Sequence, residues 1–341
     1  MPPETASQTA PPTTPAAFGT VFCDWMTVAR YRGGQWSGPA VEAVAPLALH
    51  PGAHVLHYGS SCFEGLKAFR MPDGQVRLFR ADRHAERLRR SAELLCLPLP
   101  PVEVVEGMIR EAVAANRDDT PHPPGALYLR PTLIGTEANI GAAGAPPAEA
   151  LLYILASPVG DYFSGGGRPL TVLIEEHGMR STPGFGQAKT GGNYASAMRH
   201  VVAARREHGA DQVLFCPGGD VQETGASNFL LIDDRRVLTK PLDGSFLHGV
   251  TRDSILTLAA DLGYEVVERD FSVDELLAWT AFGEAALSGT AAVLTGVGEL
   301  IRDGRRHSVG DGSIGPNTRR LRQALTDIQA GAAEDRFGWL S

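Results

Sequence analysis

The chain has 341 residues, which is enough for two domains rather than one small module. Its 39 glycines and 24 prolines accompany 43% hydrophobic residues without a collagen-like period, and this favours a loop-rich globular protein. The net charge of −8, with acidic and basic residues interspersed, argues against a nucleic-acid-binding protein.

The cysteine spacing and the first residues favour a cytoplasmic protein. Four cysteines lie far apart without a C-x-x-C pair, which predicts reduced thiols rather than a zinc ribbon or a disulfide framework: Cys23, Cys62, Cys96 and Cys216. No stretch reaches 18 consecutive apolar residues, so no membrane-spanning helix is expected. Residues 1–17 contain no Arg or Lys and no apolar block, which fits neither a secretory signal nor a transit peptide. We expect a disordered arm there.

Ordered structure is expected from residue 18, where partial apolar alternation predicts a strand leading into a polar turn. Glycines at 59 and 65 predict tight turns or a close backbone approach within 54–70. The other elements expected in the first half are a hairpin turn at 72–74, a strand at 76–80, helices at 82–95 and 102–116, and strands at 126–135 and 151–160. Asp82 is the expected N-cap of the first helix.

Three consecutive glycines and a proline within 161–169 mark the predicted boundary between two domains. We assign an arm to 1–17, a small domain to 18–164, a linker region to 165–178 and a large domain to 179–341. The elements expected in the second half include strands at 171–176 and 212–216 and helices at 195–208, 252–262 and 273–278. Strands alternate irregularly with helices and no internal repeat occurs, so the predicted fold class is α+β (mixed α/β).

Lys189 is the most suggestive residue, because glycines at 184, 186, 191 and 192 surround it. A lysine in such a turn can be approached by a planar ligand and can form a Schiff base if its pKa is depressed. The alternative is an ordinary surface lysine in a mobile loop, which the spacing alone favours.

Glu223 lies between Gly219 and Gly225, just before an apolar run. A buried carboxylate there could keep a pyridinium nitrogen protonated, as pyridoxal phosphate requires when it acts as an electron sink. The alternative is a solvated carboxylate in a turn or edge strand, which the position alone favours.

Two turns of small residues could present backbone amides to an anion. Gly249, Val250 and Thr251 precede a predicted helix, with Thr251 as its expected N-cap, and the first turn of a helix attracts anions. The turn at 288–291 has the same capacity through its amides and the Thr290 hydroxyl. The alternatives are a capped helix that binds nothing and a plain strand-entry turn.

Two arginines stand out by their context. Arg87 lies inside a predicted helix, from which it could reach a phosphate, although Arg83, Arg89 and Arg90 beside it fit a solvated basic face equally well. Arg130 interrupts an apolar strand, where a charge is costly unless paired, so a carboxylate partner or a ligand is expected.

Several other patterns are ambiguous or argue against common enzyme classes. Four aromatic residues in apolar surroundings fit either a core or a pocket: Tyr58, Phe63, Tyr128 and Tyr162. His57 and Cys62 suggest a thiol hydrolase, but no nearby acid or amide has an orienting role. Metal motifs, G-x-S-x-G, the P-loop pattern and a strand-linked G-x-G-x-x-G do not occur in a convincing context. We therefore expect no metal site, dehydrogenase, kinase or serine hydrolase.

Taken together, these segments resemble the class IV, fold-type IV pyridoxal-phosphate aminotransferases, and specifically the branched-chain amino-acid aminotransferases. The resemblance runs in fixed order through FGTVFCDWM, LHPGAHVLHYGSSCFEGLKAFR, LYLRPTLIGTEANIG, SPVGDYFSGG, AKTGGNYASAM, QETGASNFLLI, LHGVTRDSIL, LSGTAA and LTDIQAG. It covers nearly everything after the arm and favours the functional interpretation at each position above. It implies a small N-terminal α/β domain and a larger C-terminal pseudo-barrel domain.

The resemblance also implies residue roles. Lys189 would be the Schiff-base lysine and the proton carrier of the 1,3-shift, Tyr194 would hydrogen-bond the cofactor's ring oxygen, and Glu223 would bind its pyridine nitrogen. The implied phosphate ligands are Arg87, the amides of Val250 and Thr251, and Thr290. The implied substrate residues are an aromatic wall, an arginine beside it and two turns whose amides receive the α-carboxylate: Tyr58, Phe63, Tyr128, Tyr162, Arg130, Ala226 and Ala291.

Two positions depart from patterns within the family. Ala292 and Thr295 stand where one branch has a redox-sensitive C-x-x-C, so no thiol switch can form at that place. Ala226 stands where the mammalian-type enzymes have threonine, which keeps the backbone amide and removes a hydroxyl from the pocket.

The implied activity is reversible, ping-pong transfer of an amino group between L-leucine, L-isoleucine or L-valine and 2-oxoglutarate. The implied partners are these small molecules and a second copy of the chain in a homodimer, with no nucleic acid and no membrane. The alternatives are another enzyme of the same fold (a D-amino-acid or R-amine transaminase, or aminodeoxychorismate lyase) and, more remotely, a non-catalytic metabolite-binding protein. Lys189, Tyr194 and Glu223 together argue against the last, because a scaffold has no need of all three.

Overall fold

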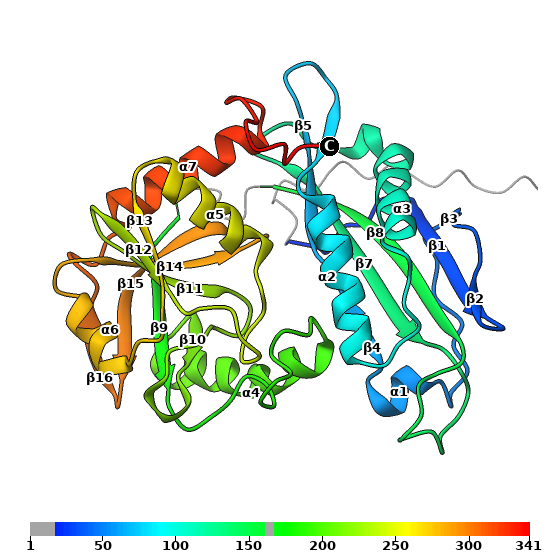
Figure 1. Ribbon diagram of the computed structural model, residues 1–341, viewed down its shortest axis with the longest axis horizontal. Helices are drawn as coiled ribbons and strands as arrows, with labels where there is room; N and C mark the ends of the chain where they lie inside the picture. The colour runs from blue at the N-terminus through cyan, green and yellow to red at the C-terminus, as the bar shows by residue number, and fades with distance from the viewer. Residues whose placement is uncertain (1–17, 161–166) are drawn as a thin grey trace, which may run out of the picture.

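The computed structural model describes residues 18–160 and 167–341 (Figure 1). The predicted arm at 1–17, the aromatic residue Tyr162 and the predicted boundary at 164 lie outside these residues. Within the described residues the chain forms two eight-stranded sheets with helices packed against them, which confirms the mixed α/β class.

The first sheet is antiparallel throughout. Its strands are β1 (Trp25–Arg32), β2 (Gln35–Trp36), β3 (Ala40–Ala43), β4 (Ser61–Phe63), β5 (Leu66–Arg70), β6 (Val76–Leu78), β7 (Ala126–Gly135) and β8 (Ala150–Val159). They follow the order β2-β1-β8-β7-β5-β6, with β3 paired to β1 and β4 paired to β7. The hairpin turn predicted at 72–74 joins β5 to β6, as expected.

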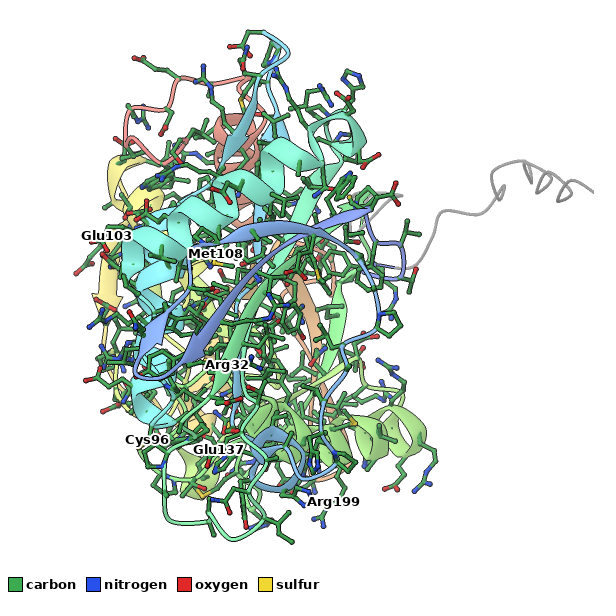
Figure 2. All side chains as sticks on the ribbon, turned by 90° about the vertical axis from the view of Figure 1, so that its right-hand side faces the viewer. Arg32, Cys96, Glu103, Met108, Glu137 and Arg199 are labelled. Atoms are coloured by element: carbon green, nitrogen blue, oxygen red, sulfur yellow. The ribbon has the colours of Figure 1, made fainter. Side chains whose placement is uncertain are left out.

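Helices cover one face of this sheet. The helices of the first half are α1 (His54–Tyr58), α2 (Ala81–Leu94) and α3 (Val102–Ala115), followed by a short 3-10 turn at Arg117–Asp119. Leu88 of α2 and Met108 of α3 lie in one buried cluster with Leu129 of β7. Figure 2 shows α3, labelled at Glu103 and Met108, running across the strands, and the Thr27 hydroxyl donates to the Met108 carbonyl at 3.1 Å. Figure 1 shows α2 on the side of the first sheet that faces the second half.

The start of α2 differs from the prediction. The helix begins at Ala81 after Arg80, which has a φ of 52° and whose backbone N–H donates to the carbonyl of Trp339 at 2.7 Å. Asp82 is therefore not the N-cap, and that prediction is wrong, because a contact with the distant C-terminus sets the start of the helix. Its carboxylate lies in the first turn, where it favours the helix dipole.

The second sheet mixes parallel and antiparallel pairs. Its strands are β9 (Leu170–Glu175), β10 (Gln212–Phe215), β11 (Asn228–Ile232), β12 (Arg236–Thr239), β13 (Glu265–Glu268), β14 (Glu284–Gly289), β15 (Val293–Arg302) and β16 (Arg305–Ser308). The order is β10-β9-β15-β14-β11-β12-β13, with β16 paired to β15. Strand β9 falls inside the range that we assigned to a linker region, and its pairing with β10 and β15 joins it to the second sheet.

Both faces of the second sheet are buried. The helices of this half are α4 (Gly191–His208), α5 (Val250–Asp261), α6 (Val273–Trp279) and α7 (Pro316–Gln329), with a 3-10 turn at Pro217–Gly219. Leu230 and Ile232 of β11 lie in a cluster with residues of α5 and α7, whereas Phe229 and Leu231 lie in a cluster with residues of α6. Because side chains alternate along a strand, these two clusters occupy opposite faces.

The two halves meet along α2 and the start of β7. Phe69 and Tyr128 of the first sheet share a buried cluster with Leu294 of β15, and the C-terminus returns to the first half (Figure 1). Phe79 pairs with Leu340, beside the edge of β6. The site described next lies where these halves come together.

Candidate active site

Lys189 is held firmly at the start of α4. Its backbone N–H donates to the Ser91 hydroxyl of α2 at 3.0 Å, and its carbonyl accepts from the N–H of Phe63 at 3.0 Å. Its amine Nζ lies 2.7 Å from the phenol oxygen of Tyr194. These contacts fix a half-buried lysine between elements of both halves, and they exclude the alternative of a mobile surface lysine.

Helix α4 starts four residues earlier than predicted. It begins at Gly191 rather than at residue 195, with Thr190 in an extended conformation as its N-cap. The Thr190 hydroxyl donates to the carbonyl of Ser61 at 2.8 Å, so a contact with the first sheet decides where the helix starts. Tyr194 consequently lies in the first turn of α4, from which its phenol reaches the amine of Lys189. Burial alone would raise the pKa of the Tyr194 phenol, but the positive charge of Lys189, aided by Arg180, lowers it below its ordinary value.

Glu223 is buried and paired with Arg180. The Arg180 Nη1 lies 2.8 Å from Oε1 of Glu223, and both side chains are at most 3% exposed. The N–H of Leu247 donates to the same oxygen at 2.8 Å, and Nδ2 of Asn228 donates to the other at 3.2 Å. This arrangement excludes the alternative of a solvated carboxylate in a turn.

Glu223 and Lys189 are close enough to interact electrostatically. Burial raises the pKa of Glu223 to about 7, while the charges of Arg180, Lys189 and Arg87 oppose that rise. The guanidinium of Arg180 also lies 5.5 Å from the centre of the Tyr194 ring. An amine, a phenol and a carboxylate therefore converge, and the pKa values of the phenol and the carboxylate are perturbed, which is typical of an active site.

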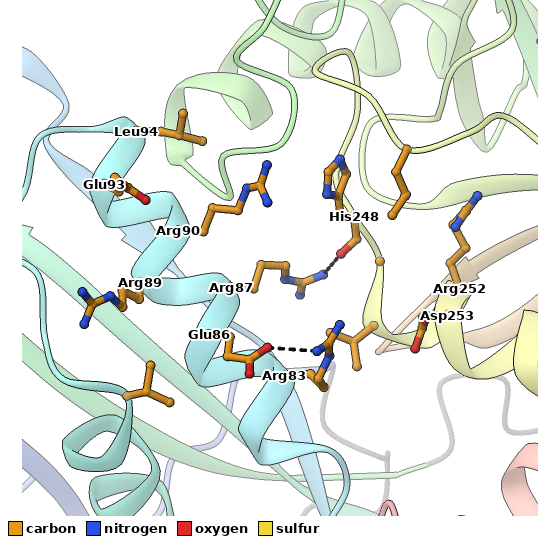
Figure 3. A pocket seen from close by; sticks show the side chains of 14 residues that line it. Arg83, Glu86, Arg87, Arg89, Arg90, Glu93, Leu94, His248, Arg252 and Asp253 are labelled. Carbon is orange, nitrogen blue, oxygen red and sulfur yellow. Dashed lines mark hydrogen bonds and ion pairs between the residues drawn. The ribbon is translucent and has the colours of Figure 1, made fainter. Parts of the chain in front are cut away.

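Arg87 is separate from the solvated arginines beside it. Its side chain is 10% exposed, whereas that of Arg83 is 51% exposed and paired with Glu86. Nε and Nη2 of Arg87 donate to the two oxygens of Glu64, and Nη1 donates to the carbonyl of His248 at 2.9 Å (Figure 3). Since a guanidinium has five N–H groups, two remain for another acceptor such as a phosphate.

The start of α5 lies directly beside Arg87. His248 precedes Gly249, and Arg87, Gly249 and Val250 line one pocket of about 550 Å³. The N-cap of α5 is Gly249, so the prediction that Thr251 caps the helix is wrong. Only glycine fits at this N-cap, because a Cβ at Gly249 would lie 2.0 Å from Oδ1 of Asn228, the residue that donates to Glu223.

The two turns predicted to receive the α-carboxylate, at Ala226 and at Ala291, lie next to each other. A Cβ at Gly289 would lie 3.2 Å from the Ser227 hydroxyl and 3.7 Å from the carbonyl of Ala226. Thr290 and Ala291 follow Gly289 in the turn between β14 and β15. The structure therefore brings together the residues predicted to present amides to a carboxylate, beside the half-buried Thr290.

Phe63, Tyr128 and Arg130 form one wall next to the lysine. The guanidinium of Arg130 lies 4.8 Å from the centre of the Phe63 ring and donates from Nη2 to the Tyr128 phenol at 2.9 Å. The Phe63 ring lies 5.2 Å from that of Tyr194. The buried Nε of Arg130 has no hydrogen-bond partner among the described residues, and the contacts that replace the expected carboxylate partner are aromatic. A ligand carboxylate or another acceptor fits this donor.

Tyr58 lies apart from this group in its own chain. Its phenol donates to the carbonyl of Ile140, its ring packs against His54, and the residue is 37% exposed. Tyr162, the remaining predicted wall residue, lies outside the described residues.

Among the buried charged residues that the sequence interpretation missed, two bind residues of this site. Glu64 is fully buried, and the charges of Arg87 and His84 hold its pKa well below its usual range although burial alone would raise it. Its position in an apolar segment was a usable signal, by the same reasoning that singled out Arg130. Arg180 stands in a polar loop that offered no such signal.

The residues present fit pyridoxal phosphate. Lys189 and Tyr194 supply an amine and a phenol, and Glu223 is a buried carboxylate suited to a protonated ring nitrogen. Arg87 and the start of α5 offer N–H groups to a phosphate. Nη2 of Arg180 is also buried without a partner among the described residues. Within those residues, no three His, Cys, Asp or Glu side chains gather as a metal site, and no helix is long and apolar enough to span a membrane.

Comparison with known proteins defines the class of this fold and site. The sequence model of the family described as amino-transferase class IV matches residues 61–300, which is most of the chain. The structure is also similar to the branched-chain amino acid aminotransferase of Escherichia coli, with a TM-score of 0.75, 30% identity, and coverage of 88% of this chain and 96% of that one. It is similar to the T.th. branched-chain amino acid aminotransferase with pyridoxamine 5'-phosphate, with a TM-score of 0.76, 27% identity, and coverage of 92% and 97%. This is a class IV aminotransferase fold.

Relatives with assigned names narrow the family further. The chain is 40% identical to a probable branched-chain-amino-acid aminotransferase of Streptomyces coelicolor, over 95% of this chain and 91% of that protein. It is 38% identical to branched-chain-amino-acid aminotransferase 2 of Bacillus subtilis, with the same coverage. The chain therefore belongs to the branched-chain-amino-acid aminotransferase family, which confirms the resemblance of the sequence.

Proposed function

We propose that the protein transfers the amino group between L-leucine, L-isoleucine or L-valine and 2-oxoglutarate, by a ping-pong route with pyridoxal phosphate as cofactor. The observation that carries this proposal is the convergence of Lys189, Tyr194 and the buried Glu223–Arg180 pair at the junction of the two halves. The names of the relatives support the same reaction.

Lys189 is the proposed attachment point of the cofactor and the residue that moves the substrate proton. When bound, pyridoxal phosphate supplies an electron sink for the electron pair left behind by the departing α-proton. The Tyr194 phenol, 2.7 Å from Nζ, orients the amine and shares its proton. Glu223, held by Arg180, would keep the ring nitrogen of the bound cofactor protonated, and that positive charge would help the ring to withdraw the electron pair.

The proposed phosphate ligands are Arg87, the amides of Val250 and Thr251, and Thr290. Glu64 orients Arg87 by accepting from two of its nitrogens, so the remaining N–H groups are held in fixed directions. The α5 dipole adds a partial positive charge at the same place.

The proposed substrate residues are Phe63, Tyr128 and Arg130, with Tyr162 as a further prediction. Their aromatic surfaces suit a branched apolar side chain, and the Arg130 guanidinium and the Tyr128 phenol offer polar contacts to the glutamate side chain. The amides of Ala226 and Ala291 would receive the α-carboxylate.

We further propose a homodimer of two-domain subunits, located in the cytoplasm. Tyr58 is exposed and lies apart from the site of its own chain, so in the proposed dimer its ring would serve the partner's site. The separate sheets support a small and a large domain, and the four unpaired cysteines suit a reducing compartment.

The test is an amino-transfer assay on the purified protein with pyridoxal phosphate. L-Leucine and 2-oxoglutarate should yield glutamate, and Lys189→Ala should lower the rate by about 100-fold or more. Lys240→Arg is the control. Lys240 is also a buried lysine, but its amine pairs with Asp220 and Asp270 and not with the groups around Lys189, so the variant should retain activity. Activity with D-alanine but not with L-leucine would contradict the proposal.

A further inference from the structure

The turn between β14 and β15 has a strained backbone. Gly289 pairs with Val293 across the hairpin, which leaves Thr290 to Ala292 as a three-residue loop. Val293 has a φ of +62°, in the left-handed region that glycine usually occupies in such loops. A β-branched residue is rare there, because its side chain crowds the backbone. Local preference therefore does not hold this turn in shape, and other contacts must do so.

Two cations from distant elements bind the carbonyls of the turn. Nζ of Lys67 donates to the carbonyl of Ala291 at 2.9 Å. Nη1 of Arg322 donates to the carbonyls of Ala292 at 2.5 Å and Leu294 at 3.0 Å. Lys67 comes from β5 of the first sheet and Arg322 from α7, so the turn is held between the two halves of the molecule.

A cavity borders the turn on the side of these cations. It measures about 430 Å³, and its lining includes Lys67, Ala291, Val293 and Arg322. The cavity leaves space into which the turn could shift, so close packing does not hold the turn on this side. The charge-assisted hydrogen bonds from Lys67 and Arg322 oppose that movement instead.

Lys67 stands in an unusual position for its residue type. The chain has only three lysines among its 31 basic residues, namely Lys67, Lys189 and Lys240. Lys67 is 9% exposed and lies directly opposite Tyr128 in the register of β5 and β7. An ammonium is a compact charge that can approach a single carbonyl closely, unlike the planar fork of arginine. Lys67 therefore joins β5, the neighbour of the strand that carries Tyr128 and Arg130, to the turn that contains Ala291.

We propose that Lys67 is a positioning residue for the substrate α-carboxylate. By binding the Ala291 carbonyl, it holds the strained turn so that the Ala291 amide points at the carboxylate, and its buried charge attracts the same group. The proposal rests on the proposed function, in which that amide receives the carboxylate.

The test compares two ligands of the holoenzyme that differ in the carboxylate. In Lys67→Met, the Kd of 4-methylvalerate should rise by about tenfold or more, the scale of one hydrogen bond to a charged group. The Kd of 3-methylbutylamine, which is leucine without its carboxylate, should change by less than about twofold, since it makes no use of this contact. The KM for L-leucine should rise more than kcat falls, and Lys67→Arg, which keeps the charge, should recover part of the affinity. Lys67→Gln serves the same purpose if Lys67→Met does not fold.

Arg70→Met is the matched control. Arg70 lies on the same strand and also binds two backbone carbonyls, those of Thr120 at 3.1 Å and Arg117 at 2.9 Å, but it does not touch the turn. Arg70→Met should leave the Kd of 4-methylvalerate and that of 3-methylbutylamine unchanged. Equal losses for the acid and the amine in Lys67→Met, or no loss for either, would overturn the positioning role while leaving the proposed function intact. Failure of the wild type to transaminate L-leucine would overturn both.

Discussion

Removing the Arg180 guanidinium tests the central electrostatic feature of the site. Arg180→Met keeps a long apolar side chain but deletes the charge that faces Glu223 at 2.8 Å. The carboxylate would then stay buried with only the N–H of Leu247 and the amide of Asn228 as donors. At about pH 8, above the pKa of about 7 for Glu223 beside Arg180, the folded variant must bury either an unpaired carboxylate or a proton taken from solution. Both are costly, so we expect the apoprotein to lose stability at this pH.

The expected loss is large enough to measure. Removing one partner of a buried ion pair costs about 3 to 5 kcal/mol. An unfolding entropy of about 2.1 cal/mol/K per residue gives roughly 0.7 kcal/mol/K for 341 residues, so the Tm should fall by about 4 to 7 °C. Scanning calorimetry of the apoproteins measures this shift without any contribution from bound cofactor.

A double-mutant cycle separates the pair from the surrounding packing. Glu223→Gln keeps an oxygen for the N–H of Leu247 while removing the negative charge, so it leaves Arg180 unpaired. The double variant buries neither charge and should lose less stability than the sum of the two single variants by about 2 kcal/mol or more. Additive losses would refute the reasoning, since they would mean that the two side chains do not depend on each other in the folded state.

Two further predictions concern titration and thiol reactivity. The pKa of Glu223 is raised to about 7 in the folded protein and returns to about 4.3 on unfolding, so between these pH values the folded state keeps a proton that the unfolded state has released. The unfolding free energy of the apoprotein should therefore fall relative to that of Glu223→Gln by about 3 kcal/mol as the pH rises from about 5 to 8. Urea unfolding measures both proteins at each pH, and a constant difference between their unfolding free energies would contradict the prediction. In a thiol titration of the native protein at about pH 8, Cys96 alone should react, because its side chain is exposed. The other three thiols are buried, and burial, with Asp119, raises the pKa of Cys23 to about 12. Four reactive thiols should appear after denaturation, and fast reaction of more than one in the native state would show that the core opens.

Elements with strong local signals were predicted well. The apolar strand predicted at 126–135 coincides with β7, and the helices predicted at 82–95 and 102–116 match α2 and α3 within about a residue. The N-cap of α2 and the starts of α4 and α5 were predicted less well. At two of them a partner distant in sequence is bound: the Trp339 carbonyl at the N-cap of α2 and the Ser61 carbonyl at the N-cap of α4. Propensity describes the chain within a few residues, so it cannot locate a boundary that a remote contact sets.

The candidate site divides in the same way. The sequence by itself determined that Lys189, Glu223 and the turns at 249–251 and 288–291 were candidates, because the spacing of glycines and small residues is visible without coordinates. It also singled out Arg130 as a charge in an apolar strand. Only the tertiary structure decided which charges face one another. Arg180 and Glu223 are 43 residues apart, and each stands in a loop whose composition is equally suited to solvent. Their pairing depends on how the loops around the second sheet fold together. The burial that results is what raises the pKa of Glu223.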